Sequence, residues 1–237
     1  MRNYFVLTFS LLTALILSGC FHPLPNPPIN GETGTLTGTV QDSVSGLPLW
    51  QGTATLAGQS APIANGSFQF TNVPVGTQTL TITTRFHKPW QKQVVIGGSE
   101  TALSAGLVPI FSAAELDLFA RLVHAEAKGE SYEGQVAVAA TVLNRLLHPD
   151  YPNTLTGVIN HVVVSGGKKY YQYEPVLNGA IKTAADQTAV NAVADALAGW
   201  DPSRKATGFF APGKVSANSW VWSRTTTVTI GNHRFFR

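Results

Sequence analysis

The sequence predicts a multidomain chain in which a small all-β sandwich is followed by an α+β domain. Residues 35–108 contain short stretches of alternating apolar and polar residues, separated by turn signals, which are typical of a sandwich. Residues 112–237 begin with apolar residues at helical spacing and end with short strand-like stretches. The chain has 237 residues, a length that accommodates two modest domains.

Residues 1–20 predict an export signal. Arg2 precedes a mostly apolar stretch, 5–17, that is too short for an ordinary membrane span. The signal ends in Leu-Ser-Gly-Cys, which resembles the lipobox of bacterial lipoproteins and implies acylation of Cys20. The alternative is a plain secretory signal that happens to contain a cysteine. Because Phe21 follows the cysteine, resemblance to lipoprotein sorting implies the outer membrane and periplasm in a cell with two membranes.

Composition limits the classes of partner. The formal net charge is only +3 and no Lys/Arg cluster is interleaved with aromatic residues, which argues against nucleic acid. Cys20 is the only cysteine, so no intrachain disulfide is expected. Residues 21–34 are rich in proline and lack periodicity, which predicts a semi-rigid tether between membrane and folded domains.

Short strands are expected throughout the first domain, at 35–40, 52–56, around 68–70, 77–84 and 93–96. Residues 101–109 are expected to form the linker to the second domain. Some segments resemble the carboxypeptidase-regulatory-like or transthyretin-like sandwich, namely 38–42 with 46–49, and 66–70 with 72–76. That resemblance carries no catalytic motif and implies a spacer or a weak cell-wall adaptor.

The second domain is expected to open with a helix from Ser112 to Gly129. Ser112 and Glu115 fit a capping box, and Gly129 is a natural stop. Ser131 and Asp186 are candidate caps of two later helices. The remaining expected helices are 132–147, 155–161 and 186–198, and the expected strands are 208–211, 220–224, 228–230 and 233–236.

Glu126 is the most informative residue of the first helix. It falls on the edge of the apolar stripe, between Phe119 and Leu122, and near the negative end of the helix dipole. Partial burial and the dipole both disfavour the ionised carboxylate, so the pKa of Glu126 is expected to be raised. A carboxylic acid that stays protonated near neutral pH is suited to acid catalysis on a sugar bond. The alternative is an exposed surface glutamate near a helix end.

Residues 116–236 resemble the SleB-type cell wall hydrolase family. Blocks that carry the resemblance occur in the family's order at 122–130, 132–140, 142–145, 151–154, 157–159, 171–173, 198–202, 220–224 and 230–233. The resemblance implies a lysozyme-like domain that acts on peptidoglycan. It also implies that the first glutamate of the stretch Glu-Ala-Lys-Gly-Glu, Glu126, is the catalytic residue.

The number of carboxylates bears on the reaction. Typical glycoside hydrolysis uses two of them, and the possible partners of Glu126 are Glu130, Glu133, Asp150, Glu174, Asp186, Asp195 and Asp201. No surrounding sequence singles one of them out. A site with one glutamate fits lytic transglycosylation, in which the muramic acid 6-hydroxyl replaces water and 1,6-anhydro ends form. The alternatives are a water-using muramidase or glucosaminidase on the same fold, and a non-catalytic wall-binding lipoprotein.

Other residues are candidates for substrate binding. Tyr171, Gln172 and Tyr173 follow a glycine-rich turn, where tyrosines can stack on sugar faces and Gln172 can bind an acetamido group. Trp222 is expected to line the same groove, and Glu130 to point into it or to cap the next helix. The family more often has Phe-Ser where this chain has Tyr173 followed by Glu174.

No metal and no cofactor are predicted. His124 and Glu126 are two residues apart on a helix and point to different sides, and the other histidines show no ligand spacing. The predicted partners are therefore glycan strands and, through the N-terminal lipid, a membrane. An enzyme that cuts the wall also implies a regulatory partner, which the sequence does not identify.

Overall fold

The computed structural model describes residues 31–237. The export signal, the acylation of Cys20 and most of the proline-rich tether lie outside the described residues and stay predictions. Within the described part, none of the helices is long and apolar enough to cross a bilayer.

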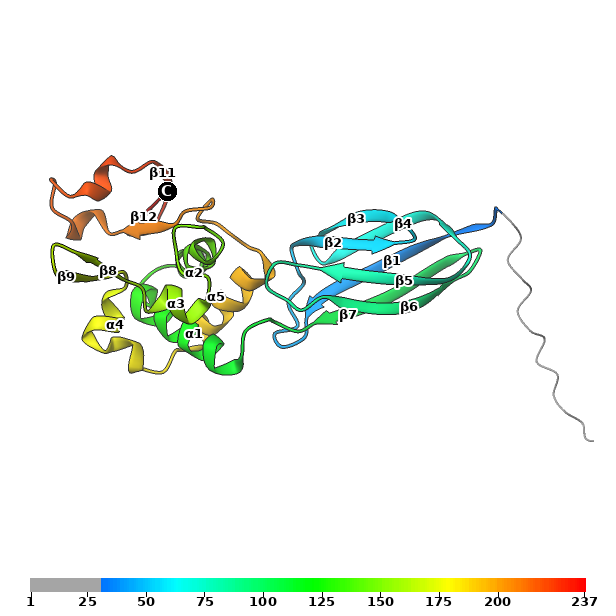
Figure 1. Cartoon of the computed structure of the whole chain (residues 1–237), viewed down its shortest axis with the longest axis horizontal. Coiled ribbons are helices and arrows are strands. Elements are labelled where there is room, and N and C mark those ends of the chain that lie inside the picture. The colour runs from blue at the N-terminus through cyan, green and yellow to red at the C-terminus, as the bar shows by residue number, and fades with distance from the viewer. Residues whose placement is uncertain (1–30) are drawn as a thin grey trace, which may run out of the picture.

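The first domain contains seven strands that run along the long axis of the molecule (Figure 1). They are β1 (Thr33–Asp42), β2 (Gln51–Leu56), β3 (Gln59–Ala64), β4 (Ser67–Pro74), β5 (Gly76–Thr83), β6 (Trp90–Ile96) and β7 (Glu100–Leu107). The hydrogen-bonded order is β6-β5-β2-β3-β4-β1-β7. Strands β3 and β4 pair only at Ala64 and Ser67, where the chain turns from one to the other. The strands therefore form two layers, β6-β5-β2-β3 and β4-β1-β7.

Alternation along the strands builds the core between these layers. Strand β1 buries every second residue along most of its length, including Leu36 and Val40. Phe68 packs its ring against Gly38, where an added Cβ would lie only 2.2 Å from the ring. A glycine on β1 therefore makes room for a large aromatic side chain from β4.

The expected linker at 101–109 is wrong for most of its length. Residues 100–107 form β7, which pairs in parallel with β1 from Thr35–Glu100 to Asp42–Leu107. Ala105 and Leu107 are buried in the domain core, because they alternate with exposed residues as a half-buried strand requires. The alternation was present in the sequence but was interrupted by small residues.

The two domains share contacts at their junction. Trp50 N donates to Ala198 O at 2.8 Å, and Gln51 Nε2 donates to Gly199 O at 3.1 Å. The ring of Trp50 stacks on that of Trp200 with centroids 6.4 Å apart. Trp50 is thus an interface residue between the two domains.

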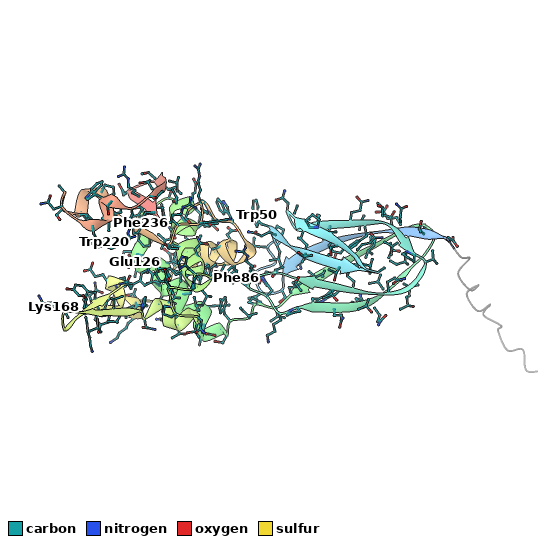
Figure 2. The ribbon with its side chains drawn as sticks, turned by 45° about the horizontal axis from the view of Figure 1, so that its top comes forward. Trp50, Phe86, Glu126, Lys168, Trp220 and Phe236 are labelled. Carbon is teal, nitrogen blue, oxygen red and sulfur yellow. The ribbon has the colours of Figure 1, made fainter. Side chains whose placement is uncertain are left out.

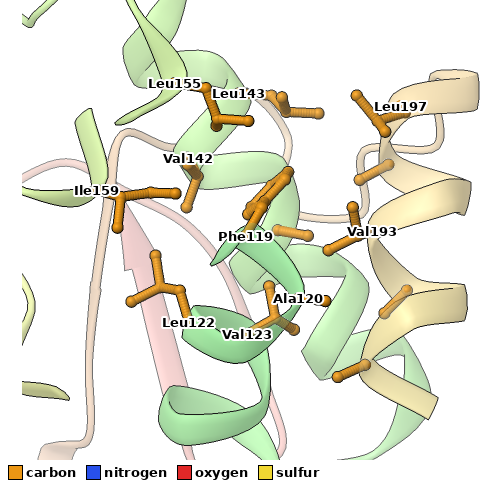
Figure 3. Close-up of a cluster of buried hydrophobic side chains, with 14 of the residues drawn as sticks. Phe119, Ala120, Leu122, Val123, Val142, Leu143, Leu155, Ile159, Val193 and Leu197 are labelled. Carbon is orange, nitrogen blue, oxygen red and sulfur yellow. The ribbon is translucent and has the colours of Figure 1, made fainter. Parts of the chain in front are cut away.

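The second domain is built around five α-helices. They are α1 (Ala113–Ala127), α2 (Tyr132–Leu146), α3 (Leu155–Ile159), α4 (Glu174–Asn178) and α5 (Gln187–Ala198). The sequence-predicted caps are confirmed: Ser112 and Glu115 form a capping box, and the side chains of Ser131 and Asp186 each accept a hydrogen bond from the backbone N–H of the third residue of their helix. Figure 3 shows the core that α1, α2, α3 and α5 enclose, with Phe119 at its centre.

Two small sheets and three 3₁₀ turns complete this domain. They are β8 (Val162–Ser165) with β9 (Lys168–Tyr171), the sheet β10 (Gly208–Phe210), β12 (His233–Phe236) and β11 (Thr226–Ile230), and the turns η1 (Ala180–Lys182), η2 (Pro212–Lys214) and η3 (Trp220–Ser223). The expected strand at 220–224 is wrong, because that segment forms η3. Its aromatic residues pack on the neighbouring sheet from outside, with Trp220 meeting Phe236 edge-on at 6.0 Å.

Candidate active site

Glu126 lies in the last turn of α1, as the sequence predicts, and its side chain is half-buried. Burial, and after it the negative charge of Glu174, raise the pKa of this carboxyl to about 7. The positive charges of Arg145 and Lys214 act in the opposite direction. Among residues 31–237 no group donates a hydrogen bond to the ionised form, so desolvation decides the balance. The expected raised pKa is therefore present, and a large share of the carboxyl is protonated at neutral pH.

The groups around Glu126 come from different elements of the second domain. Arg145 belongs to the last turn of α2, Glu174 begins α4, and Lys214 ends η2. In Figure 2, Glu126 lies between the segment that carries Trp220 and the hairpin of β8 and β9, in which Lys168 begins β9. The acid thus sits where several chain segments converge.

Arg145 is a functional candidate that the sequence analysis does not single out. Its side chain is buried, and its Nε donates to Thr207 O at 2.5 Å. Its Cζ lies 5.2 Å from the centre of the Tyr151 ring and 4.9 Å from that of Tyr173. The sequence does contain a sign of this role. Helix α2 has no charged residue between Glu133 and Arg145, which indicates a helix buried on most sides and predicts that Arg145 is buried with it.

Tyr173 is not a surface platform, which corrects the expectation that it stacks on a sugar. Its side chain is 2% exposed and belongs to the helical core. Tyr173 directly precedes α4, in which Pro175 is buried and Val176 packs against the helical core. The same packing places the Tyr173 ring in that core. Tyr171, by contrast, is exposed on β9, and Gln172 is half-buried with its backbone N–H bonded to His161 O at 3.0 Å. Tyr171 and Gln172 remain available to a ligand.

Glu130 occupies the connection between α1 and α2 and reaches to the hairpin turn at the end of the chain. Its Oε2 accepts from Asn232 N at 2.9 Å and its Oε1 accepts from Asn232 Nδ2 at 3.1 Å. Burial would raise the pKa of this carboxyl, but these two hydrogen bonds lower it on balance. Glu130 does not cap α2, where Ser131 Oγ accepts from Gly134 N. Both of its oxygens are already engaged by the protein.

The aromatic residues of η3 form a second exposed surface near the site. Trp222 is 38% exposed, and its Nε1 donates to Ser216 O at 3.0 Å. Arg234 lies over its ring at 5.3 Å from the centroid, and Trp220 is more exposed still. Trp222 is therefore anchored at one edge and partly open, as a residue that contacts a glycan requires.

Comparison with known proteins identifies the family of this domain. Residues 129–236 match the model of the Cell Wall Hydrolase family. The catalytic domain of the germination-specific lytic transglycosylase SleB from Bacillus anthracis is 36% identical, and this chain covers 98% of it (54% of this chain; TM-score 0.47). The second domain belongs to the cell wall hydrolase family. The matched range begins three residues after Glu126, so the family match does not itself include the proposed acid.

Relatives of the cell wall hydrolase domain include larger proteins. The spore cortex-lytic enzyme of Bacillus subtilis (strain 168) is 39% identical over 136 residues, which are 57% of this chain and 42% of that enzyme. The spore cortex-lytic enzyme of Halalkalibacterium halodurans is 42% identical over 125 residues, covering 53% and 35% respectively. The chain therefore spans less than half the length of these relatives. The SleB-type resemblance is confirmed for this domain, whereas the lysozyme-like architecture and the family of the β-domain stay predictions.

Proposed function

We propose that the chain is a peptidoglycan lytic transglycosylase that cleaves the bond between N-acetylmuramic acid and N-acetylglucosamine. The observation that carries the proposal is the Glu126 carboxyl, which is half-buried and has its pKa raised to about 7. Such a group can donate a proton in one step and accept one in the next at the same pH. Its place in a cell wall hydrolase domain related to a lytic transglycosylase supplies the substrate class.

The mechanism assigns both proton transfers to Glu126. The protonated carboxyl gives its proton to the glycosidic oxygen, and the bond between that oxygen and the anomeric carbon breaks. The resulting carboxylate accepts the proton of the muramic acid 6-hydroxyl, whose oxygen bonds to the anomeric carbon. The acid is regenerated, the product has a 1,6-anhydro end, and no water is consumed.

One observation favours a second candidate, hydrolysis by water. Of the carboxylates considered as partners, Glu174 is the one whose charge raises the pKa of Glu126. Four of the others are hydrogen-bonded elsewhere: Glu130 to Asn232, Asp186 to the N-terminus of α5, Asp195 to Tyr132, and Asp201 to Asn144 and Ser203. The remaining two are exposed, with Asp150 near His148 and Glu133 at the start of α2. Glu174 is exposed, so it could serve as the base that activates water.

The products separate the candidate functions. Purified peptidoglycan is digested with the protein, and the fragments are analysed by mass spectrometry for anhydro ends and reducing ends. Anhydro ends support the transglycosylase. Reducing ends that disappear in Glu174→Gln support hydrolysis instead. A protein that binds the polymer and releases no fragments is a wall-binding lipoprotein, and the enzymatic proposal is then rejected.

We also propose that the enzyme is anchored by a lipid on Cys20, at the outer membrane in a cell with two membranes. The described chain begins at the end of the β-domain that is remote from the cell wall hydrolase domain (Figure 1). The ten residues of β1 correspond to about 33 Å of extended strand, so the β-domain can act as a spacer between anchor and site. Metabolic labelling with a fatty acid tests this: the wild type should be labelled and Cys20→Ser should not. A wild type without label rejects the anchor.

A further inference from the structure

The outer face of the sheet formed by β10, β12 and β11 carries a cluster of aromatic side chains. Phe210 of β10 and Phe236 of β12 lie on this face, with ring centroids 6.1 Å apart. Trp222 meets Phe210 edge-on at 4.9 Å, and Trp220 meets Phe236 edge-on at 6.0 Å. The opposite face, with Phe235, packs into the core against α2. The two tryptophans of η3 are therefore attached to the side of the sheet that faces away from the helices.

Both tryptophans remain more open than a cover for the sheet requires. Trp220 is 61% exposed and Trp222 is 38% exposed, although each contacts a phenylalanine of the sheet. The contacts with the sheet hold one part of each indole in place, and the remainder is a rigid apolar surface in water. The C–H groups of a sugar ring present an apolar face of matching size, and the polar groups around that ring stay solvated. An indole held in this way is suited to contact sugar rings.

An arginine lies beside each tryptophan. The Cζ of Arg224 is 5.0 Å from the centre of the Trp220 ring, and that of Arg234 is 5.3 Å from the centre of the Trp222 ring. Within residues 31–237 neither guanidinium forms an ion pair with a carboxylate. Glu130 reaches the same hairpin, but both of its oxygens are bound to Asn232. Contact with an aromatic ring orients a guanidinium and leaves its N–H donors available to an anion.

We infer that this face is a binding surface for sugar rings whose peptide substituents carry free carboxylates, formed by Trp220, Trp222, Arg224 and Arg234. The indoles contact the sugar rings, and the planar guanidinium groups pair with carboxylates. Peptidoglycan combines both features in one polymer, because short peptides with free carboxylates are attached to its muramic acid residues. The inference rests on the proposed function, since it names the part of the substrate that η3 and its neighbours recognise.

The position of this surface fits such a role. Figure 2 shows Trp220, Phe236 and Glu126 in the same domain, at the end of the molecule away from the β-domain. A strand bound at η3 is therefore held by the domain that carries the acid. The exposed tyrosines of β9, Tyr170 and Tyr171, differ in one respect, because no arginine in the described part of the chain lies over their rings. Recognition of carboxylates is accordingly assigned to the η3 side.

Binding to two forms of purified peptidoglycan, freed of other anionic polymers, tests the inference. One form is untreated, and in the other the carboxyl groups are converted to neutral amides. Co-sedimentation is measured with Glu126→Gln as the parent protein, so that the polymer is not cleaved during the assay. Arg224→Gln should bind the untreated form about twofold to fivefold more weakly, the range for one exposed ion pair, and the amidated form as the parent does. Arg224→Lys, which keeps the charge, should lose less.

Trp220→Ala should bind both forms more weakly, by about twofold to tenfold, the range for one aromatic contact. Trp220→Tyr keeps an aromatic ring and should retain most of the binding. Because Trp220 and Arg224 are exposed, these variants should keep the melting temperature of the parent. Arg85→Gln is the matched control: it removes the same charge from an exposed position between β5 and β6, and should bind both forms like the parent.

Two results would overturn the inference. One is that Arg224→Gln binds the untreated form like the parent, or loses affinity equally for both forms, since carboxylates are then not what the arginine recognises. The other is that Trp220→Ala binds like the parent. Failure of the proposed function is a separate result, in which the wild type releases no anhydro fragments, and it leaves the binding measurements as they are.

Discussion

Glu126 and Glu130 lie four residues apart and occupy opposite environments. Glu126 lies at the end of a helix, accepts no hydrogen bond from the described part of the chain and has a raised pKa. Glu130 follows the helix, binds both the backbone and the side chain of Asn232, and has a lowered pKa. A glutamate side chain can donate a proton at position 126 and anchors the hairpin turn at position 130. The hydrogen bonds that only Glu130 accepts account for this difference in pKa and role.

The largest expected effect comes from removing the acid itself. Glu126→Gln keeps the shape of the side chain and cannot donate or accept the catalytic proton. Loss of general acid–base catalysis is expected to reduce the rate by about 10²–10⁴-fold, measured as release of soluble fragments from purified peptidoglycan. A variant with wild-type activity would falsify the catalytic role of Glu126. Glu133→Gln, at an exposed position on α2, is the control and should retain activity.

The same substitution should stabilise the protein at alkaline pH. The pKa of Glu126 is raised from 4.5 to about 7 in the folded state, so its contribution to stability is complete below pH 4.5 and is lost as pH rises through 7. The shift corresponds to at most about 3 kcal/mol of unfolding free energy. Urea titrations at several pH values should therefore show that the unfolding free energy of Glu126→Gln rises relative to that of the wild type between pH 4.5 and 8. A difference that does not vary with pH contradicts the raised pKa.

Glu130 should show the reverse pattern, with a loss of stability and little direct effect on chemistry. Glu130→Ala removes both hydrogen bonds to Asn232 and frees the α1–α2 connection from the β11–β12 turn. We expect a loss of about 1–2 kcal/mol of unfolding free energy, because hydrogen bonds to a charged group are involved. Because Glu130 is ionised in the folded state through these bonds, the loss should be largest near neutral pH and shrink in acid.

Thermal or urea unfolding of Glu130→Ala and of Asn232→Ala provides the measurement. The two single variants and the double variant form a cycle, and the double variant should lose little more than either single one. Additive losses would show that the two residues do not act through each other. Glu133→Ala is again the matched control, with an expected change within about 0.5 kcal/mol.

The sequence predicted Glu126 because the relevant features are local: a capped helix, an apolar stripe and a glycine stop. Residue contacts made across the chain were not predictable in this way. Glu130 meets Asn232 from a distant hairpin, and Arg145 of α2 meets the ring of Tyr173, which lies just before α4. Periodicity states which face of a helix is buried but not which side chain it meets. For the same reason the sequence predicts a linker where β7 lies, since the partner strand β1 is at the start of the domain.

The smallest and most specific effect concerns Glu174, the carboxylate whose charge raises the pKa of Glu126. Its carboxylate raises the pKa of Glu126 through space, so Glu174→Gln should lower that pKa and move the alkaline limb of the activity profile to lower pH. Because Glu174 is exposed and screened by solvent, the shift should be well under one pH unit and should shrink as salt is added. Asp150→Gln, at another exposed carboxylate, should leave the limb unchanged. A limb that stays fixed in Glu174→Gln would mean that burial alone sets the proton affinity of the acid. A loss of turnover without a shift of the limb would instead identify Glu174 as a participant in the chemistry. The site would then contain two catalytic carboxylates, Glu126 and Glu174, and Glu130 would remain the structural one.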